Sequence, residues 1–229
     1  MRIDIISAVP ALMSSFLEYS IVQRARTKGI MQIHTHDLHN YSTRKFRQID
    51  DAPYGGGSGM VLSIEPIDRC ITALQAERNY DEVIFMSPDG IPLTQNICHR
   101  LALHQNIIIL CGHYKGVDER VRTELCTMEI SIGDYVLSGG ELPAAVLADA
   151  ITRLQPGVLG DVQSALSDSF QDGLLSAPVY TRPAVYRGWA VPEILRSGHE
   201  AQIDAWRHEQ ALNRTNTRRP DLLSDHGDV

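Results

Sequence analysis

The sequence predicts an α/β fold in which strands of a parallel sheet alternate with helices, followed by a small helical domain. The first observation is that short apolar runs alternate with helical periodicity up to about residue 160. The second is that these runs are continuous and rich in β-branched residues, which is typical of strands buried on both faces. The chain has 229 residues, 43% hydrophobic and 21% charged, so a disordered or fibrous class is excluded.

Three strands are expected in the first part of the chain. Apolar and polar residues alternate in the first one, and Pro10 then opens an amphipathic stretch that predicts a helix. A Ser-Pro-Asp-Gly turn at residues 87–90 separates the second strand from a helix around residues 93–104, and the third strand ends at Gly112. The ranges of the three strands are 2–7, 83–86 and 107–111.

Residues 141–154 form the clearest predicted helix of this part. Pro143 falls in its first turn, where an amide proton is not needed. Apolar residues at i, i+4 spacing predict its packing face, namely Leu142, Val146, Ala150 and Leu154.

The composition changes after Pro156-Gly157, and this change predicts the domain boundaries. Residues 161–176 lack strong periodicity and are rich in Ser, Asp and Gln, so we expect a flexible linker or lid there. It would join a domain at residues 1–160 to a second domain at residues 177–229. Within the second domain, residues 200–213 predict a helix whose packing residues are Ile203, Trp206 and Leu212.

The net charge of −7 argues at first against a nucleic-acid partner, but the charge is unevenly distributed. Residues 1–50 carry seven Lys and Arg against four Asp and Glu, and so do residues 173–219. Residues 51–172 carry seven against 17, so an acidic centre lies between two basic flanks. The flanks fit a phosphate backbone; ordinary solvated charge is the alternative interpretation on charge alone.

Four widely spaced cysteines indicate neither a disulfide framework nor a zinc site, because no C-x-x-C pair is present. We expect reduced thiols in the core. No run reaches the roughly 18 apolar residues of a membrane span, and Asp4 and Pro10 interrupt the N-terminal segment, so no signal peptide is indicated. These observations predict a cytoplasmic protein without membrane contact.

Two polar clusters are candidate cation sites. His34, His36 and His39 form the first, although no Cys or Glu stands nearby at ligand spacing, which favours histidines on a polar face. Asp50 and Asp51 form the second, where the choice is between a hard cation bound with substrate phosphates and carboxylates that cap a turn.

Loops at the carboxyl ends of parallel strands are where α/β sheets bind ligands. Three such loops, after Met86, Cys111 and Ile132, carry glycines that let a ligand approach the backbone, so we expect a pocket there. Neither G-x-G-x-x-G nor G-x-x-x-x-G-K-[ST] occurs, which argues against a dinucleotide or P-loop site. A further Gly-rich segment, residues 53–60, is either a backbone cradle for phosphate or a flexible loop.

Seven strings along the chain occur in the same order in a known family. They are DDAPYGGGSGM (50–60), CGHYKGVDER (111–120), SIGDYVLSGGELPA (131–144), PGVLG (156–160), DSF (168–170), YTRP (180–183) and the WR…RT…RRPDLL ending. Together they resemble the bacterial tRNA (guanine-N1)-methyltransferase family over Met1 to Leu223.

The resemblance implies a SPOUT fold, in which the parallel-sheet domain ends in a deep C-terminal trefoil knot that binds S-adenosylmethionine. Periodicity alone predicts a plain doubly wound sheet, because knots are rare exceptions to the rules of chain topology. By resemblance, the residues that contact this donor are Pro88, Gly112, Ile132, Gly133, Asp134, Tyr135, Val136, Leu137, Gly139 and Gly140. They belong to the three glycine-containing loops at strand ends, after Met86, Cys111 and Ile132.

The resemblance also implies the reaction, which is methylation of N1 of the guanosine immediately 3′ of the tRNA anticodon (position 37). Neutral N1 carries a proton, so a base must remove it as the methyl group is transferred. By resemblance Asp168 is this base, and Arg153 stabilises charge on guanine O6. Without the family, Asp168 is interpreted as a helix cap or loop residue and Arg153 as part of a salt bridge. Mg²⁺ is a further expected cofactor, for which the sequence offers no clear ligand set.

Family members are homodimers that share each active site across the interface, and their helical C-terminal domain contacts tRNA. The residues expected at the tRNA are Tyr54, Gly55, Gly56, Gly57, Arg182, Arg207, Arg214, Arg218 and Arg219, with His113 and Tyr114 as further candidates. The chain departs from many members at Lys115, where Glu is usual, and at residues 197–200. The alternative function is that of a catalytically silent tRNA-binding protein of the same fold, although Asp168 and the loop of residues 133–140 are both present.

Overall fold

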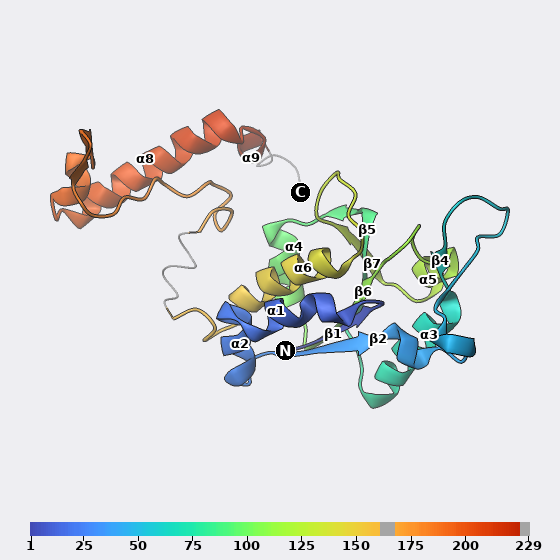
Figure 1. Cartoon of the computed structure of the whole chain (residues 1–229). Coiled ribbons are helices and arrows are strands. Elements are labelled where there is room, and N and C mark those ends of the chain that lie inside the picture. Colours follow the sequence, from blue (N-terminus) through green and yellow to red (C-terminus); the bar gives the residue numbers. More distant parts are fainter. Residues whose placement is uncertain (161–167, 225–229) are drawn as a thin grey trace. The chain divides into compact units, whose positions relative to one another are not determined.

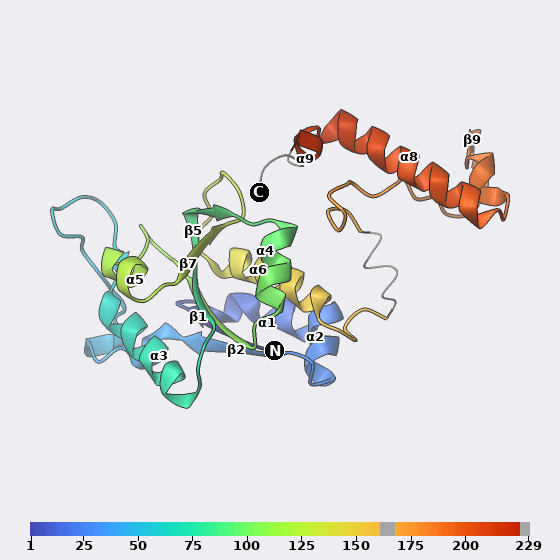
Figure 2. The same cartoon turned by 180° about the vertical axis from the view of Figure 1, so that it is seen from behind.

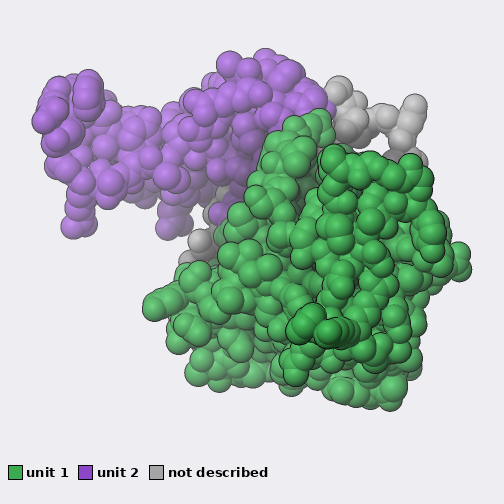
Figure 3. Space-filling view, turned by 45° about the vertical axis from the view of Figure 1, so that its right-hand side comes forward, with its two compact units in different colours: residues 1–160 green, residues 161–229 purple. Residues whose placement is uncertain are grey.

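The computed structural model describes residues 1–160 and 168–224. The chain divides into two compact units, Met1–Gly160 (unit 1) and Asp161–Val229 (unit 2) (Figure 3). Residues 161–167 of the expected linker lie outside the described residues. No helix of the described parts is long and apolar enough to cross a membrane.

Unit 1 is built on a five-stranded parallel sheet with the order β2-β1-β6-β5-β7 (Figure 1). The predicted α/β class with a parallel sheet is therefore confirmed, and β2 and β7 add to the three strand ranges predicted from apolar runs. Because all five strands run the same way, their carboxyl ends meet at one edge of the sheet. The strands are β1 (Arg2–Ser7), β2 (Gln32–Asp37), β5 (Glu82–Pro92), β6 (Asn106–Cys111) and β7 (Met128–Ser131).

Helices cover both faces of this sheet (Figures 1 and 2). One face packs against η1 (Pro10–Met13), α1 (Ser14–Glu18), α2 (Ser20–Thr27), α4 (Gln95–Ala102) and α6 (Glu141–Leu154). The other packs against η2 (Leu38–Tyr41), α3 (Ile64–Glu77) and α5 (Glu119–Glu124). The short η3 (Lys45–Arg47) and the antiparallel pair β3 (Asp50–Asp51) and β4 (Val61–Leu62) connect η2 to α3.

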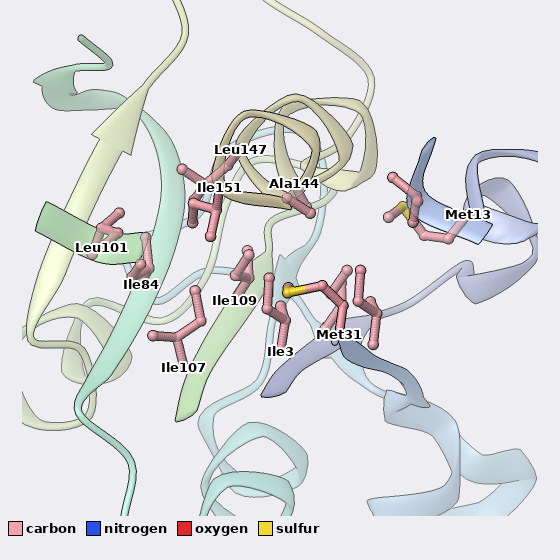
Figure 4. Close-up of a cluster of buried hydrophobic side chains, with 14 of the residues drawn as sticks. Ile3, Met13, Met31, Ile84, Leu101, Ile107, Ile109, Ala144, Leu147 and Ile151 are labelled. Atoms are coloured by element: carbon pink, nitrogen blue, oxygen red, sulfur yellow. The ribbon is translucent and has the colours of Figure 1, made fainter. Parts of the chain in front are cut away.

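Alternate residues of each central strand point into two separate cores. In β6, Ile107 and Ile109 pack on the side of α4 and α6 (Figure 4), whereas Ile108 and Leu110 pack on the side of α3. All four side chains are fully buried, and each contributes about 1.5–3 kcal/mol of burial free energy. This two-sided burial explains why the strand has no polar alternation.

The segment expected to form a turn at residues 87–90 belongs to strand β5, so that prediction is wrong. Met86 and Ile91 both lie opposite Ile130 of β7, and the residues between them are extruded as a bulge. A bulge tolerates Pro88, which has no amide proton for the ladder. The Ser-Pro-Asp-Gly signal marks an interruption of pairing here, and the strand continues beyond it.

Helix α6 has the predicted bounds, but its packing face differs from the prediction. Leu142 and Val146 are 61% and 48% exposed. Small residues let the buried face lie close to β1 and β6. Its buried apolar residues are Ala144, Leu147, Ala148 and Ile151.

Unit 2 contains one long helix, α8 (Glu200–Arg218), which begins at the predicted residue and extends beyond the predicted end. A hairpin of β8 (Val185–Tyr186) and β9 (Trp189–Ala190), the short η4 (Glu193–Arg196) and α9 (Asp221–Ser224) accompany it. The Leu175 amide donates to Oγ1 of the buried Thr215 at 2.9 Å. Part of the segment expected as linker is thus hydrogen-bonded to α8.

Candidate ligand pocket at the carboxyl edge of the sheet

A cavity of about 210 Å³ lies beside the bulge of β5 and the ends of β6 and β7. Its walls combine apolar side chains with glycine backbone, and among the described residues no Asp or Glu lines it. The lining residues are Phe85, Met86, Ser87, Pro88, Gly112, His113, Tyr114, Lys115, Gly116, Ile130, Ser131, Ile132, Gly133, Tyr135, Val136, Leu137, Ser138, Gly139, Gly140 and Pro143.

Two glycines bring the start of α6 directly against the end of β6. The Gly140 amide donates to the Gly112 carbonyl oxygen at 2.8 Å, and His113 forms an antiparallel bridge with Gly139. A Cβ at Gly140 would lie 2.7 Å from backbone atoms of both Cys111 and Gly112, so only glycine permits this approach. This glycine wall, residues 112, 139 and 140, presents backbone to the cavity without an intervening side chain.

The bulge of β5 forms another wall, and an arginine of α5 holds it. Ser87 and Pro88 line the cavity, and Arg122 pairs with the adjacent Asp89 at 3.0 Å. The same guanidinium donates to both carboxylate oxygens of Glu129 at 2.9 and 2.8 Å. Arg122 therefore ties the bulge to strand β7, a role that its sequence context does not indicate.

Lys115 connects the cavity to the Gly-rich loop of residues 53–60. Its amide donates to the Met60 carbonyl oxygen at 3.0 Å, and a Cβ at Gly59 would lie 2.9 Å from its side chain. The tip of the loop is exposed: Tyr54 is fully exposed, and residues 55–57 have positive φ with no heavy atom near their Cβ positions. The loop presents open glycine backbone to solvent.

Glu141, the first residue of α6, is a buried carboxylate behind the glycine wall. It is 1% exposed, and its Oε1 accepts a hydrogen bond from Ser7 Oγ at 2.7 Å. Its Oε2 has no hydrogen-bond partner among the described residues, and a Cβ at Gly139 would lie 2.4 Å from that oxygen. Burial raises the pKa of the neighbouring Cys111 thiol well above its ordinary value, and the charge of Glu141 raises it further. No sequence signal marks Glu141 as a site residue, although it directly follows the paired glycines.

The structure gathers most of the residues expected at the donor. Nine of the ten line the cavity, and the tenth, Asp134, is exposed and outside the lining. His113 and Tyr114, which were considered for substrate contacts, line the same cavity.

The two expected catalytic residues belong to different units, and neither is among the lining residues of this cavity. Arg153 is exposed in the last turn of α6, about 20 Å along the helix from Gly140. Asp168 is half-buried and is the first described residue of unit 2. A single chain therefore does not bring Arg153 to its own cavity.

Unit 2 has a cavity of its own, of about 720 Å³, which is lined by arginines. Arg182, Arg196 and Arg207 line it, and among the described residues no carboxylate does. The adjoining hairpin exposes Tyr186 and Trp189, whose ring centroids lie 6.1 Å apart. Arg196 belongs to the basic flank of residues 173–219 but was not among the residues expected at the tRNA, because no motif distinguishes it from the other arginines there.

The other arginines expected at the tRNA have local roles in unit 2. Arg214 donates to the Ser176 carbonyl oxygen at 3.1 Å, and Arg219 pairs with Asp221. Arg218 is exposed at the end of α8. Two of these side chains are therefore engaged in holding the fold.

A histidine of the first polar cluster belongs to a buried charge network. Asp4 is fully buried, and His36 Nε2 lies 2.7 Å from its carboxylate. Arg2 and Tyr80 also donate to Asp4. His36 is therefore half-buried and paired with a buried carboxylate, whereas His34 is exposed, as expected of a residue on a polar face.

The second polar cluster and the cysteines are likewise accounted for within the fold. Asp51 pairs with Arg44 at 2.9 Å. All four cysteines are free, and Cys126 alone is not fully buried. In residues 1–160 and 168–224, no three His, Cys, Asp or Glu side chains form a group that could hold a metal ion.

Comparison with known proteins matches residues 1–225 to a family model described as "tRNA (Guanine-1)-methyltransferase TrmD". Three similar proteins are each named "tRNA (guanine-N(1)-)-methyltransferase". The protein of Bacteroides thetaiotaomicron is 61% identical over 98% of this chain and 100% of its own length. That of Flavobacterium johnsoniae is 59% identical over 99% and 100%. That of Cytophaga hutchinsonii is 62% identical over 97% and 94%.

Proposed function

The chain belongs to the tRNA (guanine-1)-methyltransferase family, and from this premise we propose that it methylates N1 of the guanosine immediately 3′ of the anticodon (position 37) of tRNA, with S-adenosylmethionine as the donor. The observation that carries the proposal is the glycine-walled cavity at the carboxyl edge of the sheet. A tRNA substrate fits the expectation of a cytoplasmic protein.

The residues of the cavity fit this donor. Backbone amides and carbonyls of the glycine wall and of residues 132–137 are suited to hydrogen-bond a nucleobase edge, and apolar side chains such as Ile130 and Leu137 are suited to cover its faces. When bound, the donor supplies a methyl group on a positively charged sulfonium. Our proposed donor contacts are the nine expected donor residues that line the cavity, which are all of the ten except Asp134.

Asp168 is the proposed general base, and Arg153 the proposed stabiliser of charge on guanine O6. A carboxylate accepts the N1 proton and so frees the ring nitrogen for methylation, while a guanidinium lowers the cost of charge on the adjacent oxygen. Since Arg153 is about 20 Å from the cavity of its own chain, it can act only in a cavity of another subunit.

An exposed apolar stripe supports a homodimer that would supply this arrangement. Leu142 and Val146 lie on α6, and Val9 and Leu12 are exposed in and beside the adjoining η1. Arg153 follows Leu142 by three helical turns and so lies on the same face of α6. A twofold pairing with antiparallel α6 helices would place the partner subunit's Arg153 beside the glycine wall.

Unit 2 is the proposed contact surface for the anticodon branch of tRNA. The arginine-lined cavity offers Arg182 and Arg196 to phosphates, whereas Arg207, which also lines it, forms an ion pair with Asp204 at 3.1 Å. The exposed rings of Tyr186 and Trp189 suit stacking on unpaired bases.

The path of the chain after β7 supports the proposed trefoil knot of a SPOUT fold. From β7 at the edge of the sheet, residues 132–140 return past β5 to reach Gly112 at the end of β6. Helix α6 then packs on β1 and β6, near the centre of the sheet.

The test is transfer of labelled methyl from S-adenosylmethionine to tRNA transcripts with G or A after the anticodon. We expect methylation of the G transcript only, and EDTA in a parallel reaction reports the need for Mg²⁺. Absence of methylation on both transcripts would refute the activity and leave the silent binding protein. Asp168→Asn should bind both ligands and lose turnover, and normal turnover of that variant would refute the assignment of the base.

A further inference from the structure

The proposed donor is a cation, yet its cavity lacks a negative charge among the described lining residues. Lys115 carries a positive charge there, and no Asp or Glu lines the walls. A sulfonium that leaves water for an apolar cavity loses its hydration, and this loss disfavours binding unless a counter-charge compensates for it. A carboxylate directly behind the described walls is a candidate source of that counter-charge, in addition to the proposed base Asp168.

Glu141 lies directly behind the glycine wall. A Cβ at Gly139 would lie 2.4 Å from Glu141 Oε2 and 3.2 Å from His113 Nε2. Gly139 and His113 both line the cavity. Because residue 139 has no side chain, only its backbone separates the carboxylate from the cavity at this point.

The environment of Glu141 is unusual for a carboxylate with a purely structural role. Ser7 satisfies Oε1, but Oε2 has no partner among the described residues although the residue is 1% exposed. Buried polar atoms are almost always hydrogen-bonded, so an orphaned oxygen calls for an explanation. The N-terminus of the 14-residue helix α6 offsets part of the cost of the charge. The Ser7 bond alone needs only a neutral acceptor, which glutamine provides.

We propose that the Glu141 carboxylate is the counter-charge of the donor sulfonium, acting through the glycine wall as a positioning residue. The inference rests on the proposed function, because it requires the donor to bind in this cavity. Coulomb attraction is weakly screened in an interior site, so a charge one layer behind the wall still acts on the ligand. The product, S-adenosylhomocysteine, is neutral at sulfur and lacks this attraction. Glu141 therefore favours binding of the donor over retention of the product.

The test compares the affinities of both ligands for the full-length protein by isothermal titration calorimetry. The two molecules differ only by the methyl group and the charge on sulfur. Inactive protein affects the titrations of both ligands alike, so the ratio of the two affinities is insensitive to loss of active protein. In Glu141→Gln we expect the preference for S-adenosylmethionine to fall about tenfold, with little change for S-adenosylhomocysteine.

Two matched variants separate charge from structure. Ser7→Ala removes the hydrogen bond to Oε1 and keeps the charge, so the ratio should stay at the wild-type value. Asp149→Asn removes one carboxylate from the same helix, about 12 Å further along, and should also leave the ratio unchanged. Equal weakening of both ligands in Glu141→Gln would overturn the inference, and wild-type protein that binds neither ligand would overturn the proposed donor pocket instead.

A measurement on the wild-type protein covers the case that Glu141→Gln does not fold. Sinefungin carries an amine that is protonated at neutral pH where the donor has its sulfonium. We expect sinefungin and S-adenosylmethionine both to bind at least several-fold more tightly than S-adenosylhomocysteine. Equal affinity of all three ligands would overturn the inference.

Discussion

Replacing Gly140 with alanine should destabilise unit 1 and distort the cavity. The backbone of Gly140, at φ −82° and ψ −3°, is one that alanine adopts freely, so the penalty is steric. The added Cβ would lie 2.7 Å from the Cys111 Cα and from the Gly112 nitrogen, closer than real Cβ atoms come to backbone. Helix α6 and strand β6 must then separate by up to about 1 Å to restore normal contact.

The expected magnitude follows from two contributions. Overpacking of this kind costs about 1–3 kcal/mol. Separation also weakens the hydrogen bond from Gly140 to Gly112, which contributes about 0.5–1.5 kcal/mol. We therefore expect the free energy of unfolding of unit 1 to fall by about 2–4 kcal/mol, and the affinity for S-adenosylmethionine to fall with it.

Urea unfolding measures this change, and the chain supplies two internal controls. The two tryptophans, Trp189 and Trp206, both lie in unit 2, so circular dichroism reports mainly unit 1 and tryptophan fluorescence reports unit 2. Gly160→Ala is the matched substitution, since no atom lies within 4 Å of its Cβ position and its φ is ordinary. If the free energies of unfolding of Gly140→Ala and Gly160→Ala agree within about 0.5 kcal/mol, the backbone around the added Cβ relaxes without a free-energy cost. That result would refute the steric explanation.

Three further perturbations test other parts of the structure. Burial of Asp4 opposes its charge, but hydrogen bonds from His36 and two other neighbours outweigh burial and lower the pKa of Asp4. The stability that this carboxylate contributes at neutral pH should therefore be lost as the pH falls below the ordinary value of 3.8. Urea unfolding followed from neutral pH to well below 3.8 should show this loss, and Asp4→Asn should flatten it. Arg122→Ala releases the bulge of β5, so the free energy of unfolding should fall by about 1–3 kcal/mol and the affinity for the donor should fall several-fold. An unchanged affinity in calorimetry would argue against a role of Arg122 in positioning the bulge. Replacing Arg182 and Arg196 together with alanine should reduce the slope of log affinity for tRNA against log salt by about 1.5–2, and an unaltered slope would exclude them as phosphate contacts.

Local sequence signals predicted where the elements of unit 1 lie in the chain better than they predicted which faces of those elements pack together. The bounds of α6 follow from Pro143 and from apolar periodicity, but two apolar stripes compete on that helix, and periodicity cannot say which of them meets the sheet. The buried stripe is the one whose small residues, such as Ala144, allow close approach to β6. The bulge at residues 87–90 was missed because turn residues and bulge residues are the same types, and only the register with β7 distinguishes them.

The candidate site shows the same division between local and tertiary information. Glycines such as Gly112 and Gly140 stand out in the sequence because they interrupt apolar runs at strand ends. Glu141 and Arg122 do not stand out, because their importance depends on burial and on partners far away along the chain. The separation of Arg153 from its own cavity, by contrast, already follows from the predicted helix of residues 141–154, which places Arg153 about 20 Å along the axis from Gly140.

The hydrogen bond between Ser7 and Glu141 joins residues 134 positions apart, and this separation affects how the chain is synthesised. Ile3 and Ile5 are buried in the core that α6 helps to cover. Translation proceeds at about 5–20 residues per second, so the first strand waits roughly 7–30 s before its covering helix has been made. During this interval the nascent N-terminal strand has exposed apolar surface and unpaired edges. Because its core includes Val158, unit 1 can complete that core only after more than two thirds of the chain has been translated.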